Sequence, residues 1–136
     1  MSTTARPSDI IRTGLVATPL ATYKPAVIWK DDQLPFSTGS DSVVIVKTEG
    51  RARDGVYNVF DCQVWLFSPV NSTGAQMSQL IDDAIAAKNW IYDNPKFSSD
   101  ILITHHIEDV SDPIQTDTNR YICRFTVEVY SGDPNL

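Results

Sequence analysis

Cysteine and histidine are both scarce in this chain of 136 residues, which has two of each. Cys62 and Cys123 are too few for a disulfide framework, and no Cys-x-x-Cys pair is present. We therefore predict two small buried thiols. His105 and His106 are adjacent, and neighbouring residues of a strand point to opposite faces. The pair is therefore not expected to chelate one metal ion.

The sequence also lacks long apolar runs and basic runs. Its apolar runs are only a few residues long, as at Val43–Val46, whereas a membrane-spanning helix needs ~20 residues. No apolar segment follows the polar N-terminus, so we predict no secretory signal and a location in the cytoplasm of the producing cell. With 11 Lys and Arg against 17 Asp and Glu, the formal net charge is −6, which argues against a free nucleic-acid binder.

No common catalytic or phosphate-binding motif is present, whether GxGxxG, Walker A, GxSxG or HExxH. The acidic residues Asp109, Asp112 and Asp117 lack the spacing and the glycine of a calcium loop. The pair Asp82 and Asp83 is expected on the solvated side of a helix. We therefore predict no catalytic residue, no cofactor and no metal site, and we do not expect an enzyme.

Apolar patterning predicts an α+β domain spanning residues 1–136, with flexible ends at about 1–7 and 131–136. The sheet is expected to be mostly antiparallel, with two hairpins, a long helix between them and a short N-terminal helix, all helices on one face. The short helix begins with Ser8 as its N-cap and ends at Pro19. The predicted strands are 26–30, 43–49, 56–67, 101–109 and 120–130, with a turn at Gly50–Gly55 and a loop at 110–119.

The long helix is predicted over residues 73–92. Thr73 and Gln76 form a capping box, and Asn94-Pro95 ends the helix. Its apolar stripe comprises Met77, Leu80, Ile81, Ala84, Ile85 and Ile91, with Lys88 within it.

Both faces of the strand at 56–67 carry apolar residues. Phe60, Cys62, Val64 and Leu66 form the face that we assign to the core. Tyr57, Val59, Trp65 and Phe67 make the other face apolar at both ends, so that face is expected to be covered by a helix or by another subunit.

The candidate functional residues are therefore surface residues. Arg51, Arg53 and Asp54 occupy the expected hairpin tip, and arginine suits interfacial ion pairs with carboxylates. We predict that this tip and the 110–119 loop contact a partner or a neighbouring subunit. The full candidate set is Arg51, Arg53, Asp54, Tyr57, Trp65, Asp112 and Asp117.

The order of elements resembles the bacteriophage tail terminator family, also called tail completion or minor tail protein U-like proteins. The resemblance extends over about residues 8–131. It rests on the strand at 26–30, the Leu34-Pro35 loop, VVIV at 43–46, the polar turn at 50–55, QVWLFSP at 63–69, LIDD at 80–83 and RFTVEVY at 124–130.

This resemblance implies a structural virion protein of the tail or neck. Family members form a homohexameric ring on the end of the tail tube, stop polymerisation of the tube protein and provide the surface that joins the head connector. DNA passes through such a ring without specific binding. An acidic chain suits this role, because carboxylates facing the channel repel phosphates.

Three alternatives remain open at the level of sequence. The first is another phage neck protein, such as a head–tail connector or head completion protein. The second is a tail tube subunit. The third is a small enzyme or ligand-binding domain that uses His105 or His106.

Overall fold

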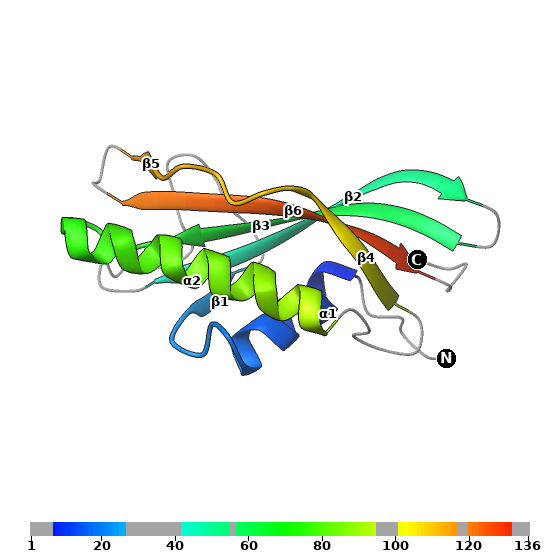
Figure 1. The fold of residues 1–136 in the computed structure, drawn as a ribbon, viewed down its shortest axis with the longest axis horizontal. Coiled ribbons are helices and arrows are strands. Elements are labelled where there is room, and N and C mark those ends of the chain that lie inside the picture. The colour runs from blue at the N-terminus through cyan, green and yellow to red at the C-terminus, as the bar shows by residue number, and fades with distance from the viewer. Residues whose placement is uncertain (1–6, 27–41, 55–56, 95–100, 117–119, 132–136) are drawn as a thin grey trace.

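The structure, a computed structural model, describes residues 7–26, 42–54, 57–94, 101–116 and 120–131. These residues form two helices and six strands, and both helices pack on one face of the sheet (Figure 1). One strand pair is parallel and the other pairs are antiparallel. The predicted α+β class, with a mostly antiparallel sheet and the long helix between two groups of strands, is confirmed.

Five strands form the path β1-β2-β3-β6-β4. They are β1 (Lys24–Ala26), β2 (Val43–Asp54), β3 (Tyr57–Phe67), β6 (Tyr121–Ser131) and β4 (Ile101–Glu108). The short β5 (Ile114–Gln115) also pairs with β6. Strands β5 and β4 pair with different stretches of β6, at Tyr121–Ile122 and at Thr126–Ser131 respectively. The predicted 110–119 loop therefore contains a short strand.

The hairpin of β2 and β3 is longer than the sequence pattern predicts. Residues Gly50–Asp54 were expected in the turn but belong to β2, and Arg53 and Asp54 pair with Asn58 and Tyr57 of β3. The pairing register shifts between Gly50 and Arg53. A glycine inside a strand is common at such a bulge, so Gly50 marks an irregular pairing and not the start of a turn.

Two other boundaries differ from the predictions. Helix α1 (Pro7–Ala17) begins one residue before Ser8, with proline at a first-turn position that needs no backbone donor. The predicted strand at 26–30 is described only at Ala26, where β1 ends. The rest of this strand lies outside the described residues. So do the predicted flexible ends, except for Pro7, which belongs to α1, and Ser131, which belongs to β6.

Helix α2 (Gly74–Asp93) follows the prediction closely. The Thr73 hydroxyl accepts a bond from the Gln76 backbone, and the Gln76 side chain accepts one from the Thr73 backbone, so the predicted capping box is present. Its buried residues are Leu80, Ala84, Ala87 and Ile91. Ile85, predicted on the apolar stripe, is 41% exposed, because the helix buries a narrower stripe than its apolar composition indicates.

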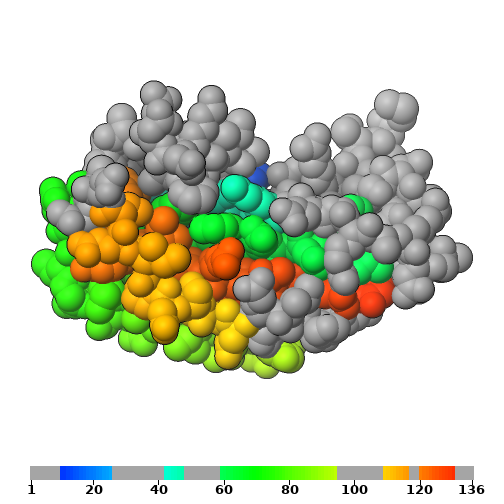
Figure 2. All heavy atoms as spheres, turned by 90° about the horizontal axis from the view of Figure 1, so that it is seen from above, coloured from blue at the N-terminus to red at the C-terminus, as the bar shows by residue number. Residues whose placement is uncertain are grey.

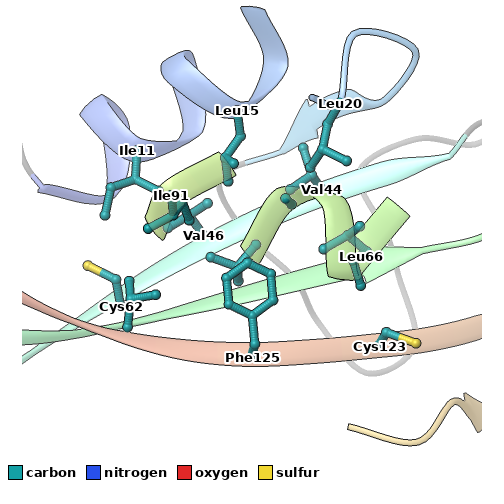
Figure 3. Packing of buried hydrophobic residues seen from close by; sticks show 14 of the residues in the cluster. Ile11, Leu15, Leu20, Val44, Val46, Cys62, Leu66, Ile91, Cys123 and Phe125 are labelled. Carbon is teal, nitrogen blue, oxygen red and sulfur yellow. The ribbon is translucent and has the colours of Figure 1, made fainter. Parts of the chain in front are cut away.

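The core lies between the two helices and the sheet (Figure 3). Ile11 and Leu15 of α1 and Ile91 of α2 point toward the strands, as Figure 3 shows. The predicted core face of β3 is confirmed, with Phe60 partly buried at its edge. The strand residues of this cluster are Val44, Val46, Cys62, Val64, Leu66, Cys123, Phe125, Val127 and Val129.

Both cysteines are free and buried, as predicted. Burial raises the pKa of the Cys123 thiol to about 11, and the negative charge of Asp112 adds to this effect. A thiol with a raised pKa is protonated at neutral pH and is a poor nucleophile. Cys123 therefore serves the core as a small apolar group.

The phenol of Tyr23 ties the segment after α1 to α2. Its hydroxyl donates a hydrogen bond of 2.8 Å to the carboxylate of Asp83. Asp83, which also accepts a bond from Gln79, is therefore not simply solvated as predicted. Burial, then the hydrogen bond and charge of Asp83, raise the pKa of Tyr23 far above its usual value.

This shift predicts a loss of stability in alkali. Above about pH 10 the unfolded chain releases the tyrosine proton while the folded chain retains it, so the free energy of unfolding falls by up to about 1.4 kcal/mol per pH unit. Below about pH 10 the contribution is fully present. Tyr23→Phe should flatten this decline in denaturant titrations at pH 9 to 11. Tyr92→Phe, at a tyrosine that is 54% exposed, is the control. An equally steep decline in Tyr23→Phe would contradict the assignment.

Candidate interaction surfaces

The predicted contact residues of the hairpin lie at one end of the sheet. Arg51, Arg53 and Asp54 are in the last part of β2, and Tyr57 opens β3. The hairpin extends past both helices (Figure 1), and beside it the last residue of β6, Ser131, pairs with Asn58. The backbone of all four candidates is described, whereas their side chains lie outside the description.

Asp112 lies at the opposite end of β6. It is exposed, between β4 and β5. The neighbouring Ser111 fixes this segment to β6: its backbone amide donates to the carbonyl of Arg124 at 2.9 Å, and its hydroxyl accepts from the Arg124 amide at 3.1 Å. Asp117 lies outside the described residues.

The two predicted contact segments are therefore separated by the length of the sheet. Asn58 pairs with Ser131 at one end of β6, and Gln115 pairs with Tyr121 at the other. Figure 1 shows the hairpin tip and β5 at opposite ends of the molecule. Of the candidates whose position is described, the hairpin residues thus lie at one end of the sheet and Asp112 at the other, with Trp65 between them.

Trp65 lies on the sheet face opposite the helices, between two cations. It pairs across the strands with Ile45 and Arg124. The Lys47 ammonium is 5.6 Å and the Arg124 guanidinium 5.3 Å from the centre of the indole ring. Both distances suit cation–π attraction. The indole nitrogen donates a bond of 3.2 Å to the side chain of Gln63. All of these side chains except Ile45 are half-buried.

We name the set of Lys47, Trp65 and Arg124 the cationic patch. Figure 2 shows that side chains of β2 (cyan), β3 (green) and β6 (orange to red) reach the molecular surface in the middle of that view. No ion pair of the Arg124 guanidinium occurs in the described part of the chain. Sequence reasoning selected Trp65 but missed Lys47 and Arg124. Alternation within β6 does not say which residue of a neighbouring strand Arg124 meets, and only the register of β6 against β3 brings it to Trp65.

The apolar end of this face is buried within the chain. Val43, Ile45, Phe67 and Ile122 form a second buried cluster, and Trp65 packs against it. We expected a helix or another subunit to cover this face, yet both helices lie against the other one. Phe67 is only 1% exposed, so it is not an interface residue. Trp65, which packs against this cluster, is half-buried.

The structure describes the two histidines by their backbones alone. The backbones of His105 and His106 lie in β4, where they pair with Glu128 and Val127. Their side chains lie outside the description, so their predicted opposite orientation stays a prediction. Among the described residues no three potential ligands lie close enough together to hold a metal ion. Neither helix in those ranges is both long and apolar enough to cross a membrane.

Comparison with models of known protein families gave no match, and neither did comparison with curated protein sequences.

Proposed function

We propose that this chain is the tail terminator of a tailed bacteriophage. Copies of it form a ring on the end of the finished tail tube, block further addition of tube protein and present a surface to the head connector. The element order on which the sequence resemblance rests agrees with the fold that the described residues adopt. The proposal does not depend on any catalytic group.

The observation that carries the proposal is the separation of the two contact segments. A terminator must contact the tube on one side and the connector on the other, so it needs partner-binding surfaces at opposite ends. The hairpin with Arg51 and Arg53 lies at one end of the sheet, and the segment with Asp112 at the other. We assign the hairpin to the tube and the Asp112 end to the connector.

The charge of the chain suits a ring through which DNA passes. Each copy carries a formal charge of −6, and six copies carry six times that charge around one channel. Acidic walls repel phosphates, so DNA can slide through without adhering. A ring protein that bound DNA tightly would retard ejection.

Deletion of the gene from its phage tests this proposal. Negative-stain electron microscopy of the lysate should show tails of excessive and irregular length beside filled heads that carry no tail. Tails of normal length beside unjoined heads would instead indicate a head–tail joining protein. Intact infectious particles would exclude a role in the virion and return attention to His105 and His106.

A further inference from the structure

The end of the sheet that carries Asp112 is held by a hydrogen-bond arrangement that occurs three times. Ser68, Ser111 and Thr116 each pair with one residue at or just before the start of β6. In each pair the amide of the serine or threonine donates to the carbonyl of the partner residue, and its hydroxyl accepts from the amide of that same residue. The hydroxyl thus takes the place that a backbone carbonyl has in a strand pair.

The segment Ser111–Thr116 has one of these pairs at each of its ends, and we name it the anchored segment. All six donor–acceptor distances of the three pairs lie between 2.8 and 3.1 Å. Between the two ends, β5 pairs with β6. The backbone of the anchored segment is therefore fixed to β6 along its length. The pairs are Ser68 with Tyr121, Ser111 with Arg124, and Thr116 with Arg120.

Two side chains of the anchored segment, Ile114 and Asp112, are exposed on this fixed backbone. Ile114 is 56% exposed, the largest fraction among the large apolar side chains that the structure describes. No hydrogen bond or ion pair of the Asp112 carboxylate occurs within the described ranges. Figure 2 shows the segment (orange) at the molecular surface. Single exposed apolar residues are common. Here, however, a partner would not have to order the backbone on binding, which lowers the entropic cost of the contact.

The anchored segment is poorly suited to strand pairing with a partner. Its strand β5 is only two residues long, and Asp112 and Pro113 directly precede it. Short length, charge and proline are features by which edge strands avoid pairing with other chains. The segment therefore offers a partner its side chains, with an apolar one close to a negative one.

We propose that Ile114 enters an apolar pocket of the head connector and that a basic residue at the rim of this pocket faces Asp112. This inference rests on the proposed function and deepens it, since it names the chemistry of the partner at the end that we assign to the connector. The apolar side chain supplies affinity, and the opposite charges orient the partners and speed their association.

Binding to tailless heads tests the contact. Heads purified from phage that makes no tails expose the connector and serve as the probe, and the amount of chain that sediments with them is measured across a range of concentrations. We expect Ile114→Ala to weaken binding at least about tenfold. Ile85→Ala, at an isoleucine of α2 that is 41% exposed, is the matched control and should bind as the wild type does. Equal binding by Ile114→Ala and the wild type would overturn the contact.

The salt dependence of the same binding tests the role of Asp112. Salt screens the attraction between opposite charges, so wild-type binding should weaken as the salt concentration rises. Asp112→Asn should bind more weakly than the wild type at low salt and should depend less on salt. An unchanged salt dependence in Asp112→Asn would overturn the basic residue that we place opposite this carboxylate.

A third variant tests the fixed backbone. Ser111→Ala removes the hydroxyl that accepts from the Arg124 amide, and Ser111→Thr keeps it. We expect Ser111→Ala to weaken binding to the heads and Ser111→Thr to restore it, although neither change alters Ile114 or Asp112. Wild-type binding by Ser111→Ala would show that the anchoring does not contribute to the contact.

Capping of purified tail tubes, scored for the same proteins, separates this inference from the proposed function. Ile114→Ala should cap tubes as the wild type does, because the hairpin at the other end is unaltered. Capping by the wild type together with normal binding of Ile114→Ala to heads would overturn the contact and leave the function in place. A wild-type chain that binds heads through Ile114 but caps no tube would overturn the function and retain the contact.

Discussion

A chain with Arg51→Glu and Arg53→Glu is expected to fold normally and to lose tube capping. Both positions lie in the part of β2 that extends past the helices, away from the core. Arginine is frequent among interface hot spots, whose loss costs about 2 kcal/mol or more each, and ~1.4 kcal/mol is a tenfold change in affinity. The affinity for tube ends should therefore fall about a hundredfold or more.

The measurement is the fraction of tube ends that carry a ring in electron micrographs, across a range of protein concentrations. The matched control, Arg51→Lys with Arg53→Lys, keeps both charges and should retain most of the capping. Circular dichroism establishes that both variants are folded. Normal capping by the glutamate variant would remove the hairpin tip from the mechanism.

Replacement of Phe125 by alanine is expected to have the largest effect on stability. Phe125 is 0% exposed, at the centre of the sheet face that both helices cover (Figure 3). Truncation of a buried phenylalanine costs about 3–5 kcal/mol, from lost burial and the cavity left behind. The free energy of unfolding of a small domain is only about 5–15 kcal/mol. Phe125→Ala is therefore expected to remove a large fraction of it.

Denaturant unfolding followed by circular dichroism measures this cost. Ile114→Ala is the control, because Ile114 lies on β5 beside β6 and is 56% exposed. A surface truncation of this kind changes stability by about 0.5 kcal/mol or less. Similar losses at both positions would show that Phe125 is not a central part of the core.

Local signals account for the elements that the sequence predicted well. The capping box at Thr73 and the stop at Asn94 depend on residues a few positions apart, and strand faces follow from simple alternation. Helix α2, the buried face of β3 and the buried cysteines therefore follow from short windows of sequence.

Pairing between distant segments of the chain accounts for most of the features that the sequence did not predict. The position of β6 between β3 and β4, and the extension of β2 through Gly50, depend on hydrogen bonds that no local pattern encodes. The cationic patch needs the register of three strands before Lys47, Trp65 and Arg124 come together. The burial of Phe67 on the face that neither α1 nor α2 covers is likewise a tertiary property.

The central claim is that this chain ends the growth of a tail tube. The most direct measurement is the length distribution of tubes polymerised from the purified tube protein of the same phage, with and without this chain. We predict shorter tubes that stop growing, each with a ring at one end, and no tubes from this chain alone. Unchanged tube lengths with bare ends would contradict the claim, and tubes formed by this chain alone would identify it as a tube subunit.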